Sequence, residues 1–135
     1  MILKIFTDGG SKGNPGPSAI GVSFIKDEKE VFKYREDIGL ATNNVAEYAA
    51  LIKAMELIKS NSSGFMDNVS TIVFNSDSKL MVNQVNGLYK VKNSRIREFI
   101  MKIRILESEI KLPIKYQQIP REKNLRADNL VNNKY

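Results

Sequence analysis

Four acidic residues have the type and the placement that metal-dependent chemistry requires. Asp8 and Asp77 each close a run of β-branched and aromatic residues of strand length. Glu47 and Asp128 each lie just inside the start of a helical pattern. Clustered carboxylate oxygens are typical ligands of hard divalent cations. If the two strand ends and the two helix starts meet at one edge of a sheet, these acids form a divalent-metal site.

Each acid also has an ordinary structural interpretation. Asp8, before two glycines, is typical of a turn, and Glu47 is typical of a capping box whose cap would be Asn44. Asp77 could cap the helix that follows it, and Asp128 could be an acid near a helix N-terminus, worth about 0.3–1 kcal/mol. Any one of these interpretations is adequate alone, but four acids at positions that can converge favour the metal site.

Both helical acids are expected on faces that turn toward the core. Glu47 shares a face with Leu51, and Asp128 shares a face with Val131 of a short helix that Asn124 is expected to cap. An acid on such a face needs a partner, because an unpaired buried charge costs several kcal/mol or must take up a proton. A bound cation would be such a partner.

Composition narrows the available chemistry. The 135 residues include no cysteine and no histidine, which excludes thiolate sites, imidazole metal sites and a Ser-His-Asp triad. Catalysis must therefore use carboxylates, lysines, hydroxyls or a metal. No apolar run approaches about 20 residues, and the first six residues are too short for a signal peptide. We expect one domain spanning residues 1–135, a cytoplasmic setting and no membrane partner.

The net charge of +6 is concentrated in one segment. Residues 79–104 hold the single acid Glu98 and seven basic residues, namely Lys79, Lys90, Lys92, Arg95, Arg97, Lys102 and Arg104. A basic segment of this kind predicts binding of a polyanion. A solvated helix face explains the basic residues of the helix equally well, but it explains those of the probable loop at 90–95 less well.

The apolar periodicity predicts one α/β domain without repeats or linkers. Strands are expected at 2–8, 18–26, 30–38, 71–76 and 113–119. Helices are expected at 44–59, 78–86, 94–110 and 125–133, with a polar loop at 60–68. The first three strands should pair antiparallel, whereas a strand reached through a helix joins the sheet in parallel. Helices packed on a five-stranded mixed sheet satisfy this pattern.

With these residues and their spacing, the chain resembles type 1 ribonuclease H over nearly its full length. The matching stretches are Thr7-Asp8-Gly9-Gly10-Ser11, Asn14-Pro15-Gly16-Pro17, Thr42-Asn43-Asn44, Ala46-Glu47-Tyr48, Asp77-Ser78, Gln84, Gly87-Leu88-Tyr89, Asn124 and Ala127-Asp128. The resemblance implies a ribonuclease H-like α/β fold, with a five-stranded mixed sheet of order 3-2-1-4-5 flanked by helices.

The resemblance also implies an activity, the endonucleolytic hydrolysis of the RNA strand of an RNA/DNA hybrid with two Mg²⁺ or Mn²⁺ ions. Two such ions can activate water and stabilise the leaving 3′ oxygen, so no protein nucleophile is required. The catalytic, metal-binding acids carry over to Asp8, Glu47, Asp77 and Asp128. By family likeness Asp8 and Asp77 would span both ions, Glu47 would hold one of them together with substrate, and Asp128 would hold the other.

Other matching positions imply contacts with nucleic acid. Selection of RNA requires contacts to 2′-hydroxyl groups. For Asn44 the helix-capping role remains an equal alternative. The substrate-binding candidates are Asn14, Thr42, Asn43, Asn44, Ser78, Lys79, Lys90, Lys92, Arg95 and Arg121.

The chain departs from many members of the family at three places. The loop before the last helix carries no histidine, and Arg121 is the candidate to take over part of its role, although a permanent cation cannot act as a base. Lys79 stands where many members have an amide, which favours a phosphate contact. The segment 86–93 is too short for an additional basic helix, so binding would depend on Lys90, Lys92 and Arg95.

Two other classes of function stay open at this point. The chain could be a nucleic-acid-binding module without activity, although intact carboxylates argue against it. It could also be a nuclease of double-stranded RNA, whose A-form geometry resembles that of a hybrid, or a DNA strand-transfer enzyme, for which its size is small. A monomer that acts on an RNA/DNA hybrid is the expectation.

Overall fold

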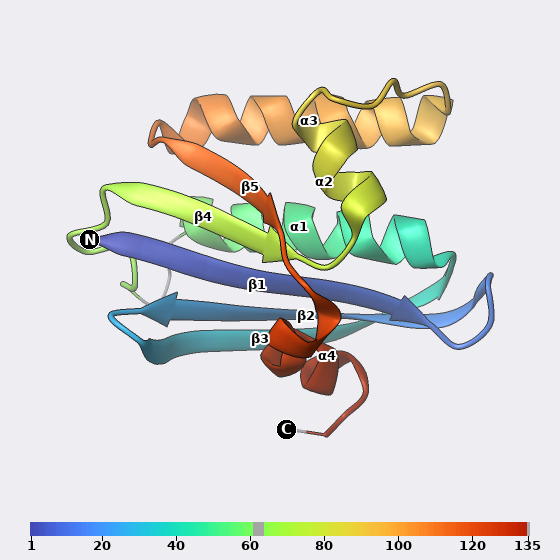
Figure 1. The fold of residues 1–135 in the computed structure, drawn as a ribbon, viewed down its shortest axis with the longest axis horizontal. Helices are drawn as coiled ribbons and strands as arrows, with labels where there is room; N and C mark the ends of the chain where they lie inside the picture. The colour runs from blue at the N-terminus through green and yellow to red at the C-terminus, as the bar shows by residue number, and fades with distance from the viewer. Residues whose placement is uncertain (61–63, 135) are drawn as a thin grey trace.

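The computed structural model describes residues 1–60 and 64–134, and a five-stranded mixed sheet forms its centre (Figure 1). The strands are β1 (Ile2–Ser11), β2 (Gly16–Lys26), β3 (Lys29–Ala41), β4 (Thr71–Ser76) and β5 (Ile114–Gln118). Their order is β3-β2-β1-β4-β5, with antiparallel pairing of β1 with β2 and of β2 with β3, and parallel pairing of β4 with β1 and β5. The predicted fold class and strand order are confirmed.

Helices cover both faces of this sheet. They are α1 (Asn43–Ser60), α2 (Lys79–Val85), α3 (Ser94–Ile110) and α4 (Leu125–Val131), with a 3₁₀ turn at Arg121–Lys123. In Figure 1, α1 lies behind the sheet next to α3, whereas α4 crosses in front of it. Among the described residues, no helix is long and apolar enough to cross a membrane.

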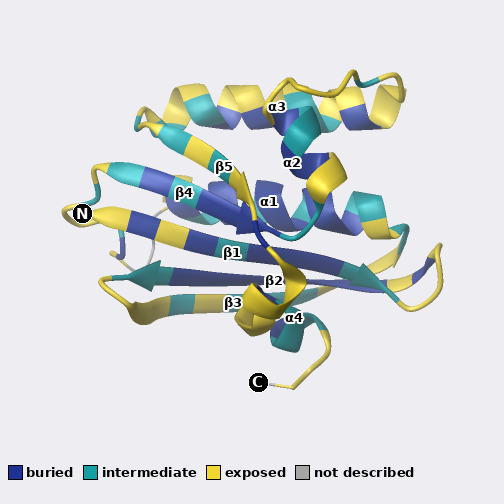
Figure 2. Cartoon of the chain, viewed as in Figure 1, coloured by how far each residue is buried: buried dark blue, intermediate teal, exposed yellow. Residues whose placement is uncertain are grey.

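The core fills the layer between the sheet and α1 with α3. Leu3 and Ile5 of β1, Phe24 of β2 and Tyr48 of α1 are fully buried, as is Ile103 of α3. Figure 2 shows the same distribution, with buried segments along β1, β2 and α1 and exposed residues on the outer side of α3 and in the loop before it. The apolar periodicities of strands and helices therefore predict the core correctly, because burial of apolar surface drives folding.

Several element boundaries differ from the expectation. β1 does not end at Asp8, because Gly9 and Gly10 continue the ladder opposite Ile20 and Ala19 of β2, so the interpretation of Asp8 as a turn residue is wrong. Part of the polar loop predicted at 60–68, residues 61–63, lies outside the described residues.

The predicted helix caps are also corrected. The Thr42 hydroxyl, rather than Asn44, accepts a hydrogen bond from the N–H of Val45 at 3.2 Å, and Asn44 lies inside α1. Ser78, rather than Asp77, caps α2. Asn124 occupies the N-cap position of α4 but forms no side-chain cap bond. These side chains are therefore free of the capping roles expected for them.

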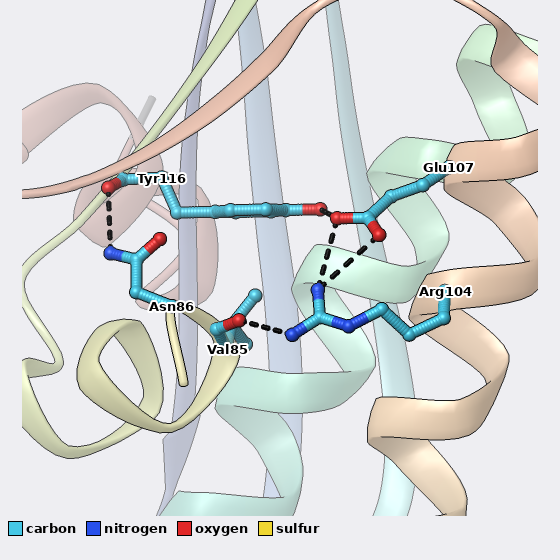
Figure 3. Close-up of polar contacts among 5 residues, drawn as sticks. All are labelled: Val85, Asn86, Arg104, Glu107 and Tyr116. Carbon is cyan, nitrogen blue, oxygen red and sulfur yellow. Dashed lines mark hydrogen bonds and ion pairs between the residues drawn. The ribbon is translucent and has the colours of Figure 1, made fainter. Parts of the chain in front are cut away.

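A polar cluster ties α2 and β5 to α3 (Figure 3). The Arg104 guanidinium donates to the Val85 carbonyl at the end of α2 and pairs with Glu107 at 3.1 Å. The Tyr116 hydroxyl of β5 donates to the same Glu107 carboxylate at 2.7 Å, and the Asn86 amide donates to the Tyr116 carbonyl at 3.1 Å. Burial, reinforced by the hydrogen bond to Glu107, raises the pKa of the Tyr116 hydroxyl. The cluster fixes the point at which the chain leaves α2.

We expect Tyr116→Phe to lower the free energy of unfolding by about 1–2 kcal/mol, because the partly buried Glu107 carboxylate, a charged acceptor, loses the hydrogen bond that the Tyr116 hydroxyl donates. Urea denaturation followed by circular dichroism measures this change. Tyr89→Phe, on the exposed loop after α2, is the matched control and should leave the midpoint unchanged. Equal midpoints for the two variants would show that the Tyr116 hydroxyl does not stabilise the fold.

Candidate active site

Close contact between β1 and α1 brings the first two acids together. A Cβ atom added to Gly9 would lie 2.1 Å from the backbone carbon of Ala46, so only glycine allows α1 to lie this near the strand. The Gly9 N–H donates to the Glu47 carboxylate at 2.7 Å. Glu47 is therefore bound to the strand residue that follows Asp8, and its interpretation as part of a capping box is wrong.

Three of the four predicted acids form one cluster. One carboxylate oxygen from each of Asp8, Glu47 and Asp77 lies within 4.8 Å of the other two. Asp77 follows the last residue of β4, and β4 runs parallel to β1, so their carboxyl ends meet at the same edge of the sheet. Asp8 and Glu47 are only 8% and 9% exposed, whereas Asp77 is half-buried. The expected convergence of strand ends and a helix start is observed for these three residues.

Asp128 approaches the cluster from α4, which lies on the face of the sheet opposite α1. Gly21 of β2 lies opposite Asp8, and a Cβ atom added to it would be 2.6 Å from the Ala127 carbonyl oxygen, so α4 packs directly on the strand there. The Asp128 carboxylate pairs with the exposed Arg121 guanidinium at 3.6 Å. Arg121 thus places a positive charge beside the fourth acid.

Asn124 links α4 to the strand that carries Asp8. Its side chain is fully buried and donates to the Thr7 carbonyl oxygen at 2.9 Å. Its own amide oxygen has no hydrogen-bond partner among the described residues. The residue therefore serves as a tether between β1 and α4 instead of the predicted helix cap.

The acids repel one another in the absence of a counter-charge. Burial raises the pKa of Asp8 from 3.8 to about 7, and the charges of Asp77 and Asp128 add to this rise. Burial followed by repulsion from Asp8 raises the pKa of Glu47 well above its usual value, although the Gly9 N–H opposes this. Burial also raises the pKa of Asp77, against the lowering effect of Arg121. The positive charge of Arg121 opposes the rise in the pKa of Asp8 and of Asp77 but does not cancel it.

A hard divalent cation fits this donor set. The three clustered residues supply only carboxylate oxygens, the ligand type that Mg²⁺ and Mn²⁺ prefer, and no sulfur or imidazole competes. A cation would also offset the burial and the repulsion that together raise the three pKa values. This acidic triad is therefore typical of a divalent-metal site.

An open cleft of about 630 Å³ leads to the acids. Three basic residues, Lys12, Arg35 and Arg121, line it together with Asp8, Glu47, Asp77 and Asp128. Sequence reasoning did not single out Lys12 or Arg35. The position of Lys12 between two glycine-containing segments of the hairpin was a usable signal, whereas Arg35 lies in an ordinary strand pattern.

The amides predicted to contact substrate form a small network beside this cleft. The side-chain amide oxygen of Asn14 accepts from the Asn43 backbone N–H at 3.0 Å, and the Asn43 side-chain oxygen accepts from the Ser11 N–H at 2.9 Å. These bonds fix the β1–β2 turn to the start of α1. Asn14 and Asn43 remain exposed, whereas Thr42 and Asn44 are partly buried.

The basic candidates lie apart from the acids. Lys79 is exposed at the first residue of α2, beside the partly buried Ser78. Lys90, Lys92 and Arg95 are exposed in and after the loop that joins α2 to α3, and we refer to these three residues as the basic loop. The Arg95 guanidinium lies 5.7 Å from the centre of the Phe99 ring, which orients it. None of the three lines the acidic cleft, so they form a separate surface.

Comparison with known proteins agrees with this fold. A family model described as reverse transcriptase-like matches residues 6–134. LC11-RNase H1, isolated from compost and solved in complex with an RNA/DNA hybrid, is 40% identical, with a TM-score of 0.87 over 97% of this chain and 94% of that chain. The chain belongs to the ribonuclease H-like family.

Its type 1 members are among the similar proteins. RNase H1 from the halophilic archaeon Halobacterium salinarum has a TM-score of 0.87 at 32% identity, covering 99% of this chain and 97% of that one. A bifunctional protein of Mycobacterium tuberculosis is 36% identical over 134 residues, which are 98% of this chain. That stretch is 35% of the mycobacterial protein, so the chain spans about a third of the length of the first curated relatives it matches.

Proposed function

We propose that this chain is an endoribonuclease that hydrolyses the RNA strand of RNA/DNA hybrids with divalent metal. The observation that carries the proposal is the convergence of Asp8, Glu47 and Asp77 at the floor of an open cleft. The solved hybrid complex of LC11-RNase H1, a protein similar over nearly the whole chain, supports the choice of substrate.

The proposed roles follow from position and charge. Asp8, Glu47 and Asp77 would hold Mg²⁺ or Mn²⁺, with Asp128 completing the set from α4. Two bound ions would supply activation of the attacking water and stabilisation of the leaving 3′ oxygen. The protein contributes a buried, fixed arrangement of negative charge, and the Gly9 N–H keeps the Glu47 carboxylate in place.

Substrate contacts are proposed on two surfaces. The exposed amides of Asn14 and Asn43 border the cleft and offer donors and acceptors to the 2′-hydroxyl groups that distinguish RNA from DNA. Arg121, paired with Asp128, can also meet a phosphate near the acids. The basic loop would contact phosphates away from the cleavage site and supply affinity rather than chemistry.

Replacing Lys90, Lys92 and Arg95 with alanine should raise the KM for hybrid and leave kcat almost unchanged. Each lost phosphate contact should reduce the slope of log affinity against log salt by about 0.9 on a B-form-like duplex. Fluorescence anisotropy with a labelled hybrid, repeated over a series of salt concentrations in chelator, measures the slope.

The matched control replaces Lys29, Lys111 and Lys115, three exposed lysines near the other end of the sheet. This control removes the same charge and should leave both the KM and the salt slope near their original values. If the two triple variants lose equal affinity, general charge rather than a located surface binds the hybrid.

A substrate panel tests the proposed function directly. Matched RNA/DNA, RNA/RNA, DNA/DNA and single-stranded RNA are incubated with Mg²⁺, with Mn²⁺ or with chelator. We expect cuts in the RNA strand of the RNA/DNA hybrid only, and only with metal. Cleavage of RNA/RNA at a comparable rate would change the substrate to RNA duplexes, and binding without any cleavage would make the chain a binding module.

A further inference from the structure

The short helix α4 is held at its C-terminal end by Arg35, a residue of the edge strand β3. The Arg35 Nε atom of β3 donates to the Leu130 carbonyl oxygen at 2.7 Å, and Nη2 donates to the Val131 carbonyl oxygen at 3.4 Å. These carbonyls belong to the last turn, where a cation is favourable, and the Leu130 oxygen also accepts from the Asn133 N–H at 3.3 Å. α4 has only seven residues, so one such contact holds a large part of it.

The sheet register explains why Arg35 can reach α4. Arg35 lies opposite Gly21 of β2, and Gly21 lies opposite Asp8 of β1. Residues that are directly opposite share one face of a sheet, so the three form a row across it. Gly21, in the middle, has no side chain, and α4 occupies the space above it. Arg35 and Asp8 therefore border α4 from its two sides.

Arg35 is itself fixed in place. Its guanidinium pairs with Asp37 at 2.9 Å, and its side chain is 18% exposed. The hydrogen bond and the charge of Arg35 lower the pKa of Asp37, so this carboxylate stays ionised beside it. The Arg35 side chain therefore keeps one orientation, toward the carbonyls of α4.

The end of α4 is connected in turn to Asp128. Asn132, the residue after α4, donates from its side-chain amide to the Asp128 carboxylate at 3.3 Å and to the Asp128 carbonyl at 3.0 Å. A shift of the last turn would move Asn132, and the Asp128 carboxylate would lose that donor. Arg35 therefore binds the Leu130 and Val131 carbonyls, and Asn132, the next residue along the chain, binds the Asp128 carboxylate.

We propose that Arg35 is a positioning residue for hybrid cleavage, which sets the place of the Asp128 carboxylate by holding the last turn of α4. This inference rests on the proposed function, because it assigns Arg35 to the reaction through Asp128. Arg35 lines the cleft, but its guanidinium is bound to the α4 carbonyls and to Asp37, so we expect its contribution in kcat rather than in hybrid affinity.

Arg35→Met tests the inference, with Arg126→Met as the matched control. Arg126 lies on α4 itself and pairs with Glu30 at 3.6 Å, outside the acidic cleft. A displacement of about 1 Å can cost up to about a hundredfold in rate, so we expect kcat of Arg35→Met to fall about tenfold at an unchanged KM. Arg126→Met should keep its kcat. Arg35→Lys, which keeps the positive charge, should recover part of the lost kcat. All assays are run well below the Tm of each variant, so that only folded proteins are compared.

A double-mutant cycle separates positioning from a general effect. In an Asp128→Asn background, Arg35→Met should produce no further loss of kcat, because the carboxylate that it positions is gone. A further loss of the same size would overturn the inference, as would an effect of Arg35→Met that appears only in the KM.

A third measurement does not depend on activity. Amide hydrogen exchange in residues 125–131 should be faster in Arg35→Met than in the original protein or in Arg126→Met. Unchanged protection would overturn the inference. If the original protein cleaves no hybrid in the substrate panel while α4 loses protection in Arg35→Met, the proposed function fails and the anchoring of α4 by Arg35 stands.

Discussion

Asp8→Asn should abolish cleavage of the hybrid while leaving most of the binding intact. Asp8 lies at the centre of the acid cluster, and loss of one carboxylate should weaken metal-dependent stabilisation of the transition state by about 4 kcal/mol, or about a thousandfold in rate. Duplex affinity should be retained because it comes mainly from phosphate contacts on other surfaces. Single-turnover cleavage in Mg²⁺ and anisotropy in chelator measure the two properties separately.

Asp77→Asn should behave in the same way, because Asp77 shares the cluster. Asp67→Asn, an exposed acid in the turn before β4, is the matched control and should cleave at the original rate. A variant of Asp8 or Asp77 that keeps near-original turnover in Mg²⁺ would remove that residue from the catalytic set. A parallel loss of binding would instead show that the acids organise the fold of the substrate surface.

The stability of the metal-free protein should fall as the pH rises from about 4 to about 7. The pKa of Asp8 is raised from 3.8 to about 7 in the folded state, so over this interval the folded protein binds more protons than the unfolded chain. The stability is greatest while both states are protonated and is lost as the pH passes the folded-state pKa. At 1.36 kcal/mol for each pKa unit, the loss is on the order of 4 kcal/mol. Thermal melts in chelator across this pH range measure it.

Repulsion of Asp8 by Asp77 and Asp128 contributes to its raised pKa and leads to two further expected results at pH 7. Asp8→Asn should melt at a higher temperature than the original protein in chelator, although it is inactive, because a charge has left a crowded site. Saturating Mg²⁺ or Mn²⁺ should raise the Tm of the original protein. At a hundredfold excess of the metal over its Kd, binding adds about 2.7 kcal/mol to the free energy of unfolding. If the variant melts no higher in chelator and metal shifts neither melting curve, the acids do not form a repulsive metal site.

Much of the fold could be predicted from periodicity, because its helices and strands are long enough to show their pattern. The stripe of α3, with Ile96, Ile103 and Leu106 buried, predicted that helix with its correct bounds. The strand order came from the resemblance to a family. Short local signals were less reliable. The two glycines after Asp8 are typical of a turn, but they continue β1, where Gly9 is needed for contact with α1.

The sequence predicts a site residue well when both its type and its place at the end of a strand or the start of a helix indicate metal binding. It predicts a residue's role less well when that role depends on a contact with a residue far away in sequence. Asp8, Glu47 and Asp77 converge because strand ends and a helix start meet, which a sequence pattern can indicate. Glu47 resembled a capping residue because its partner, the Gly9 N–H, lies 38 residues away in sequence. Arg35 gave no signal at all, since its partners are carbonyl groups nearly a hundred residues later and carbonyls have no side-chain identity.

The bond between Asn124 and the Thr7 carbonyl has a consequence for the order of folding. It joins residues 117 positions apart, so the wall of the cleft that carries Asp128 is assembled only after the chain between them has been synthesised. Closing so large a loop has a high entropic cost, and contacts of this range form slowly. A nascent chain that has already built β1, β2, β3, α1 and β4 thus presents Asp8, Glu47 and Asp77 without the fourth acid, Asp128. The onset of hybrid cleavage during synthesis would report completion of the domain rather than formation of its central sheet.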